Sequence, residues 1–318
     1  MRPPCPVKAA VVIPARNEAA RIGACLHALA AQDLTDVAVM LVANNCGDGT
    51  GPVARACAAA LDINLVVLDC TLPVGHGVGT ARRLGCDAAL ATWPDAEALL
   101  CTDADSLTAP DWIERNLHYL GHVAAVCGRV EPMSDELFVL QDMELSPAEM
   151  EGRYEALVIA YYRLMKPGPC GLTGDHGHAA GASLSVRTTA YRAVGGFANI
   201  PTGEDRDLVR RLKAAGHGVL HAGDVRVAAS CRLDGRAQGG MSDALRARAD
   251  RTDYLIDDAL PPARPLIDAA LQGTLGPWPL EVAPTDRLRA RDLAPQIALL
   301  EAALGEASVS GSMQVPAQ

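Results

Sequence analysis

Aromatic side chains are scarce in this chain of 318 residues, since Phe, Tyr and Trp together make up 3% of it. So few rings offer little surface on which single-stranded nucleic acid could stack. The net charge of −10 also argues against a nucleic-acid backbone or an anionic membrane as the main partner. We therefore expect no nucleic-acid partner. An anionic ligand can still be held locally by a few arginines or by a cation.

The sequence also lacks a Cys-x-x-Cys pair, although it holds ten cysteines. Cys70 and Cys101 lie inside apolar stretches, where cysteine behaves as a small hydrophobe. Neither a structural zinc site nor a disulfide framework is expected. No apolar run approaches about 18 residues and no charged-then-apolar leader occurs, which predicts no transmembrane segment and no signal peptide. We expect a soluble cytoplasmic protein and leave open whether it forms a homo-oligomer.

The apolar content is enough for a sizeable core: 49% of the residues are hydrophobic and the mean hydropathy is +0.11. Short apolar runs alternate with helical patterns, which is typical of a parallel sheet covered by helices on both faces. Right-handed crossovers then place the loops after the strands along one edge, where ligands bind. Predicted strands cover residues 8–14, 37–43, 64–70, 97–102 and 122–132, and predicted helices cover 18–32, 48–61, 78–93 and 110–120.

Two carboxylates follow one of these strands in the stretch LLCTDADSLTAPDW, residues 99–112. One interpretation is a polar turn in which Ser106 or Thr108 caps the helix that Pro110 begins. The other is a metal site, because Asp103 and Asp105 at the mouth of an apolar strand would be poorly solvated without a cation. Mg²⁺ and Mn²⁺ prefer oxygen ligands and bind carboxylates together with ligand phosphates. Both interpretations can hold at once.

A second acidic pair, Glu204 and Asp205, lies in the stretch IPTGEDRDLVRRL at the predicted first turn of a helix. Acids are favoured there by the helix dipole. The alternative is a general base that deprotonates an acceptor hydroxyl, since adjacent carboxylates raise one another's pKa.

A glycine-rich loop, PVGHGVGTARRLG at residues 73–85, also precedes a predicted helix. It keeps an NAD(P)-dependent oxidoreductase as a rival hypothesis. Its spacing is Gly-x-Gly-x-Gly, however, and it follows the third strand, whereas the dinucleotide fingerprint is Gly-x-Gly-x-x-Gly after the first.

Four segments, taken in order over residues 8–236, resemble the family 2 glycosyltransferases of the GT-A fold. They are VVIPARNEAARI, NNCGDGT, the Asp-Ala-Asp of residues 103–105, and AGASLSVRTTAYRAVGGF with the later GEDRDLVRRL. The resemblance implies an α/β fold with a Rossmann-like, mostly parallel central sheet flanked by helices. We divide the chain into a GT-A domain (1–236) and a helical C-terminal extension with a disordered tail (237–318). Residues 1–132 would form the nucleotide-sugar-binding half and 133–236 the acceptor-side half.

The resemblance also implies roles for individual residues. Asp105 would coordinate Mg²⁺ or Mn²⁺ bridging the donor diphosphate, and Asp103 would contact the metal or the ribose. Asp205 would be the catalytic base, with Glu204 orienting the acceptor. The remaining residues implied to bind the nucleotide sugar are Pro14, Ala15, Arg16, Asn17, Glu18, Asn44, Asn45, Arg82 and Arg232. The expected function is a metal-dependent hexosyltransferase, with a non-catalytic nucleotide-sugar-binding relative as an alternative.

The sequence departs from the family pattern at Ala43, where the family commonly has an Asp that contacts uracil. Asn44 or Asn45 could substitute, and the donor base stays open. The Gln-x-x-Arg-Trp motif of processive synthases is absent, which favours a single transfer. Inversion is the family's usual outcome, whereas retaining relatives take a third metal ligand from a His. His221 lies near that place in the sequence, although Ser230 or Arg232 could occupy it.

The segment 134–178 lies where the family's acceptor-shaping insertions fall, so we expect it to recognise the acceptor. His176 and His178 would contact the acceptor or be satisfied in a loop, rather than bind a metal. Tyr161 and Tyr162 are expected to be core or interface residues.

Overall fold

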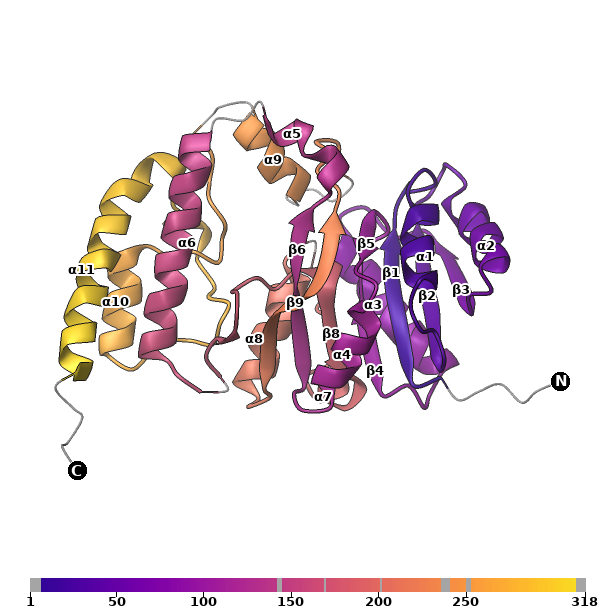
Figure 1. The fold of residues 1–318 in the computed structure, drawn as a ribbon, viewed down its shortest axis with the longest axis horizontal. Helices are drawn as coiled ribbons and strands as arrows, with labels where there is room; N and C mark the ends of the chain where they lie inside the picture. Colours follow the sequence, from indigo (N-terminus) through magenta and orange to yellow (C-terminus); the bar gives the residue numbers. More distant parts are fainter. Residues whose placement is uncertain are drawn as a thin grey trace.

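A mixed nine-stranded sheet flanked by helices dominates the computed structural model of the protein (Figure 1). The structure describes residues 7–141, 145–168, 170–200, 202–235, 241–249 and 253–312. The strands are β1 (Ala9–Ala15), β2 (Val37–Asn44), β3 (Leu65–Cys70), β4 (Ala98–Cys101), β5 (Ser106–Thr108), β6 (Ala125–Pro132), β7 (Thr173–Gly174), β8 (Leu184–Arg187) and β9 (Val219–Ala229). The helices are α1 (Ile22–Ala30), α2 (Thr50–Ala60), α3 (Val78–Thr92), α4 (Trp112–Leu120), α5 (Phe138–Gln141), α6 (Leu145–Met165), α7 (Thr188–Ala193), α8 (Glu204–Ala214), α9 (Met241–Ala249), α10 (Ala263–Leu271) and α11 (Leu293–Ser312).

The strands follow the order β3-β2-β1-β4-β8-β6-β9-β5, and β7 pairs with β9. β1 to β4 are parallel, and β9 is parallel to β6. β8 runs antiparallel to β4 and β6, and β5 runs antiparallel to β9. The carboxyl ends of β1, β2, β4, β6 and β9 therefore meet at one edge of the sheet. The α/β class and the mostly parallel sheet are confirmed.

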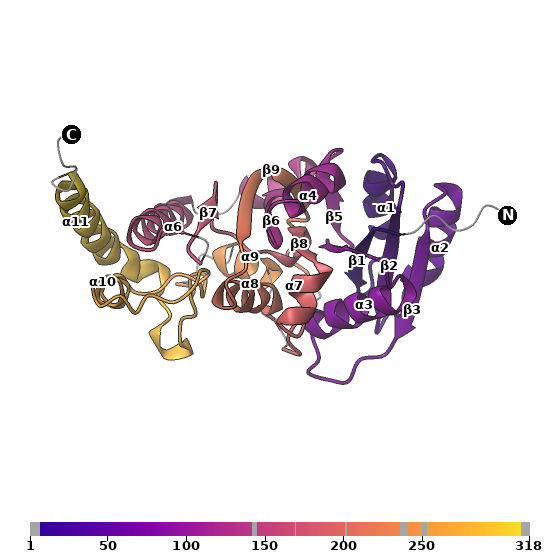
Figure 2. The ribbon, with the colours of Figure 1, turned by 90° about the horizontal axis from the view of Figure 1, so that it is seen from below.

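Helices cover both faces of the sheet because the strands are apolar on both sides. In β1, Val11 and Ile13 belong to the core shared with α1, α2 and α4, whereas Ala10 and Val12 belong to the core shared with α3, α7 and α8. Figure 2 shows these two helical layers on opposite sides of the strands.

A third core joins α6 to α10 and α11 at the end of the molecule away from β3 (Figure 1). Tyr161 and Tyr162 are buried there, as expected of core residues, and Tyr162 donates its hydroxyl to the Gly276 carbonyl at 2.7 Å. Thus α6 packs with the C-terminal helices, although our division of the sequence put it with residues 133–236. The boundary after residue 236 lies outside the described residues.

α11 continues to Ser312, so the first residues of the predicted tail are helical, and residues 313–318 lie outside the described part. Within the part of the chain that the structure describes, no helix is long and apolar enough to cross a membrane.

The predicted helix cap after the Asp-Ala-Asp stretch is wrong. Ser106 and Thr108 lie in strand β5, which pairs with Val227–Ala229 of β9, and the Thr108 hydroxyl accepts a hydrogen bond from Gln32 at 2.8 Å. α4 begins later, at Trp112, and its first turn has no side-chain cap. Pairing with β9, which lies more than 100 residues further along the chain, outweighs the local capping preference.

Candidate active site

Polar side chains collect at the carboxyl edge of the sheet, where β1, β2, β4 and β9 end. The loop after β1 carries Asn17 and Glu18, the loop after β4 carries Asp103 and Asp105, and β9 leads into Ser230 and Arg232. Because β8 is antiparallel, the segment entering it approaches the same edge and brings Gly181 there. Most of the residues that the sequence analysis selected are therefore brought together.

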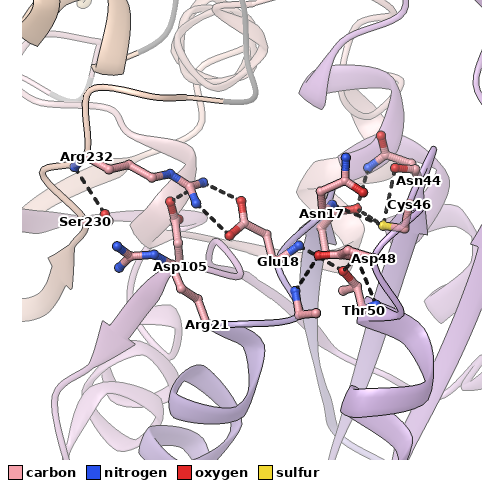
Figure 3. A network of polar contacts seen from close by, with 12 residues as sticks. Asn17, Glu18, Arg21, Asn44, Cys46, Asp48, Thr50, Asp105, Ser230 and Arg232 are labelled. Atoms are coloured by element: carbon pink, nitrogen blue, oxygen red, sulfur yellow. Dashed lines mark hydrogen bonds and ion pairs between the residues drawn. The ribbon is translucent and has the colours of Figure 1, made fainter.

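The loop after β1 is fastened to the loop after β2. Asn17 has a positive φ of 54°, a conformation that Asn tolerates better than most residues. Its backbone N–H lies 3.3 Å from the Cys46 sulfur, and its side-chain oxygen accepts the Gly47 N–H at 2.8 Å. The turn of Asn17 is thus set by contacts between two loops (Figure 3).

Asp48 and Thr50, at the start of α2, complete this attachment. Asp48 accepts hydrogen bonds from the backbone and hydroxyl of Thr50, at 3.0 and 2.5 Å, and from the Ala19 N–H at 2.9 Å. The Thr50 oxygen also accepts the Glu18 N–H at 2.9 Å. Neither residue was among the predicted site residues, although an Asp two residues before a Thr is typical of a side chain that bonds its own turn.

Arg232 reaches from the end of β9 to Glu18 and Asp105 (Figure 3). Nη1 donates to Glu18 Oε2 at 2.8 Å, Nη2 donates to Glu18 Oε1, and Nη2 lies 2.9 Å from Asp105 Oδ2. Glu18 is buried, so this bidentate pair compensates its desolvation. The Arg232 guanidinium therefore links Glu18, which is 214 positions away in the sequence, to Asp105, the predicted metal ligand.

Asp105 lies in an environment short of positive charge. Burial and the neighbouring Asp103 raise the pKa of Asp105 to about 6, even though Arg232 acts in the opposite direction. A carboxylate with so raised a pKa can gain from a further cation beside it.

Arg82 forms a second link, between Asp103 and Glu204. Its side chain is 2% exposed; Nη2 donates to Asp103 Oδ1 at 2.6 Å, and Nη1 donates to Glu204 Oε1. Glu204 is also 2% exposed, whereas Asp103 is 34% exposed. Glu204 is thus a buried partner of Arg82, and the geometry gives no support to its predicted contact with an acceptor.

Asp205 follows Glu204 in the first turn of α8. Its Oδ2 accepts the Gly181 N–H at 2.7 Å and its Oδ1 accepts the Arg206 N–H at 2.7 Å. A carboxylate has about four lone-pair positions, so Asp205 retains the capacity to accept a substrate hydroxyl. A side chain at Gly181 would place its Cβ 2.3 Å from Arg82 Nη1, so glycine is the residue that fits against this buried guanidinium.

The other residues predicted to bind the nucleotide sugar are placed as follows. Pro14 and Ala15 are buried in β1, and Arg16 is exposed just after it. Asn44 donates to the Ala15 carbonyl at 2.9 Å. Asn45 is bonded in both directions to the Leu72 backbone, at 3.0 Å each, and so ties down the loop after β3. Ala43 is buried at the end of β2.

The candidates for a third metal ligand are engaged elsewhere. His221 is fully buried; its Nδ1 lies 2.9 Å from the His178 carbonyl and its Nε2 lies 3.2 Å from Lys213 Nζ. Ser230 donates its hydroxyl to Glu136 at 2.8 Å. Arg232, which cannot bind a metal, is therefore the residue that faces Asp105.

The side chains at this edge fit a hard divalent cation. Asp103 and Asp105 supply carboxylate oxygens, and together with Glu18, Glu204 and Asp205 they outnumber the guanidinium groups of Arg82 and Arg232. The described residues contain no group of three or more His, Cys, Asp or Glu side chains arranged to hold a metal. Such a site matches an ion bound by one or two carboxylates plus ligand phosphates, as Mg²⁺ usually is.

A mixed sheet flanked by helices, with carboxylates and arginines gathered at its carboxyl edge, agrees with the GT-A fold expected from the sequence. The profile described as "Glycosyltransferase like family 2" matches residues 6–233. The chain belongs to this family, so the predictions of family, fold and glycosyltransferase class are confirmed. The oxidoreductase hypothesis has no support, since the glycine-rich loop follows β3.

Solved structures share the fold. One is the mannosyltransferase PcManGT from Pyrobaculum calidifontis in complex with GDP-Man and Mn²⁺, with a TM-score of 0.54 and 17% identity over 98% of this chain and 76% of that one. Another is S. aureus TarS 1-349 in complex with UDP-GlcNAc, with a TM-score of 0.51 and 15% identity over 83% of this chain and 65% of that one. No curated protein matches the sequence significantly.

Proposed function

We propose that this protein is a divalent-cation-dependent hexosyltransferase that moves a sugar from a nucleoside-diphosphate sugar to an acceptor hydroxyl. The observation that carries the proposal is the convergence of two linked carboxylate groups at one sheet edge. Glu18, Asp105 and Arg232 form one group, and Asp103, Arg82 and Glu204 form the other, with Asp205 beside it.

Asp105 and Asp103 would hold Mg²⁺ or Mn²⁺ at the donor diphosphate. When bound, the cation supplies charge stabilisation for the departing nucleoside diphosphate. Arg232 presents a second positive charge beside Asp105, at 2.9 Å, and binds the same diphosphate. The loop of Asn17 and Glu18, fastened to α2, forms the wall for the base and ribose.

Asp205 accepts the proton of the acceptor hydroxyl as the acceptor oxygen bonds to the anomeric carbon. In the same step the bond from that carbon to the diphosphate oxygen breaks, which inverts the configuration. Gly181 and Arg206 hold the carboxylate through backbone N–H groups, so its orientation is fixed before the substrate binds. Arg82 orients Asp103 on one side and the start of α8 on the other.

A donor-only assay tests the proposal. Release of nucleoside diphosphate from a panel of UDP- and GDP-sugars is expected with Mn²⁺ or Mg²⁺ and is expected to stop with EDTA. Asp105→Asn should lower the rate at least a hundredfold while the melting temperature stays close to that of the wild type. With an acceptor present, Asp205→Asn should lower transfer strongly and leave the affinity for the donor unchanged.

Two results would contradict the proposal. Binding of nucleotide sugars without any turnover would favour a non-catalytic relative. Turnover in EDTA equal to that with Mn²⁺ or Mg²⁺, or equal turnover in Asp105→Asn and the wild type, would show that the reaction does not need the cation.

A further inference from the structure

A cavity of about 330 Å³ lies between α6 and the segment 175–178. Its polar lining comes from Glu155 and Arg163 on α6 and from Asp175, His176 and His178 on the segment. Its volume lies at the small end of ligand pockets, which span roughly 300–1,000 Å³. The cavity therefore suits one sugar-sized group.

Small residues on α6 keep this cavity open. Gly152, Ala156 and Ala160 line it at intervals of four residues and so share one face of the helix. All three are exposed. Larger side chains at these positions would fill the space, and no helical requirement favours glycine at position 152.

The polar lining is held by contacts within the protein. Arg163 donates to the Gly174 carbonyl, and Asp175 accepts the Gly223 N–H at 3.1 Å. His178 Nδ1 lies 3.6 Å from Glu155 Oε1, across the cavity from segment to helix. His176 Nδ1 accepts the His178 N–H at 3.2 Å. The lining is thus largely preformed.

A short stretch of chain connects the cavity lining to the contact of Asp205. His178 and Gly181 are three residues apart, which limits the distance between their Cα atoms to about 11 Å. Both ends of this short stretch are fixed, because His221 bonds the His178 carbonyl at 2.9 Å and Asp205 bonds the Gly181 N–H at 2.7 Å. Three positions along the chain therefore separate His178 of the lining from Gly181, which bonds the proposed base.

The charges of the lining decide what can enter. Glu155 and Asp175 present carboxylates, which accept hydrogen bonds from hydroxyls and repel phosphate. Burial, with His178 as the next cause, lowers the pKa of His176 to about 4, so this imidazole is neutral near pH 7. The guanidinium of Arg163 is engaged with Gly174.

We propose that this cavity is the acceptor subsite and that it takes a neutral, hydroxyl-rich group, such as a monosaccharide unit, in preference to a phosphorylated one. The assignment rests on the proposed transferase function.

Saturation-transfer NMR with the full chain tests the assignment. The probes are millimolar methyl hexopyranosides, with mannose 6-phosphate and glucose 6-phosphate as anionic counterparts. We expect saturation transfer to at least one neutral glycoside, reduced at least fivefold in Ala156→Leu. Ala160→Leu is a second variant that fills the cavity, and Ala56→Leu, on the exposed face of α2, is the matched control that should keep the signal. Leucine is a good helix former, so all three variants should fold.

The assignment is overturned if no neutral glycoside gives a signal, if both filled variants bind as the wild type does, or if the hexose phosphates bind more tightly. The donor-only assay separates this failure from that of the proposed function. Metal-dependent release of nucleoside diphosphate by the wild type upholds the transferase whatever the NMR result.

Discussion

Replacing Arg82 with Met is expected to destabilise the protein more than any surface substitution. The guanidinium is 2% exposed and is shared by Asp103 and Glu204. In Arg82→Met, Glu204 keeps its charge in a buried position without a partner. Breaking a buried ion pair in this way typically lowers the free energy of unfolding by about 3–5 kcal/mol.

Most of this loss comes from Glu204. Asp103 is 34% exposed, so water can replace the guanidinium there, and Asp103 contributes little to the loss of stability. The Arg82→Met/Glu204→Met double variant removes both members of the fully buried pair. Apolar replacement of a buried pair is often close to neutral, so the double variant should regain most of the lost stability.

Urea unfolding at pH 7.5, followed by circular dichroism, measures all four members of this cycle. The single variant should also melt on the order of 10 °C below the wild type. Two results refute the reasoning: a loss below about 1 kcal/mol in Arg82→Met, or a double variant as unstable as the sum of its singles. Either result would mean that Glu204 is not held by Arg82.

Three further predictions follow from the same contacts. Gly181→Ala brings Cβ within 2.3 Å of Arg82 and should lower both the melting temperature and turnover. Gly23→Ala, in helix α1, meets nothing within 4 Å and should leave turnover unchanged without lowering the melting temperature, because Ala favours a helix more than Gly does. Equal losses in the two variants would contradict the close packing at Gly181. Arg232→Gln should weaken nucleoside-diphosphate binding in calorimetry by roughly 10- to 100-fold, and unchanged affinity would remove Arg232 from the donor site. Burial lowers the pKa of Lys213 to about 8 from its usual 10.5. Between pH 8 and 10.5 the unfolded chain therefore binds more protons than the folded one, and the free energy of unfolding rises with pH. The stability of the wild type relative to Lys213→Met should thus increase by about 3 kcal/mol from pH 8 to 10.5, and a flat difference would contradict the shift.

The sheet could be predicted from the sequence because its strands are near-continuous apolar runs. The stretch KAAVVIP predicted a strand over residues 8–14, and β1 covers Ala9–Ala15. The short strand β5 was missed for the opposite reason. Ser106 and Thr108 have the local pattern of a helix cap, and only pairing with β9 makes them a strand.

The positions of the candidate site residues along the sheet edge could be predicted, but their partners could not. Strand order puts Asp103 and Asp105 at the carboxyl edge whatever else they contact. Arg82 and Glu204 are 122 residues apart, and Glu18 and Arg232 are 214 apart. Nothing in local spacing distinguishes an arginine that pairs with Glu204 from the adjacent Arg83, which donates to the Phe197 carbonyl. The sequence predicted a role for Glu204 at the acceptor, which stays a prediction, and the structure adds its ion pair with Arg82.

These partners explain how an acidic chain can gather so many carboxylates at one edge. Each arginine is shared by two acids, Arg82 by Asp103 and Glu204 and Arg232 by Glu18 and Asp105. In each case one acid is buried and the other is partly exposed: Glu204 and Glu18 anchor the guanidinium, whereas Asp103 and Asp105 stay accessible. The anchoring acids thus hold the arginines in place when a ligand engages the accessible ones. Since the accessible pair is also the Asp-Ala-Asp motif, the buried glutamates would position the proposed donor site, and Asp205 would remain available to the proposed acceptor.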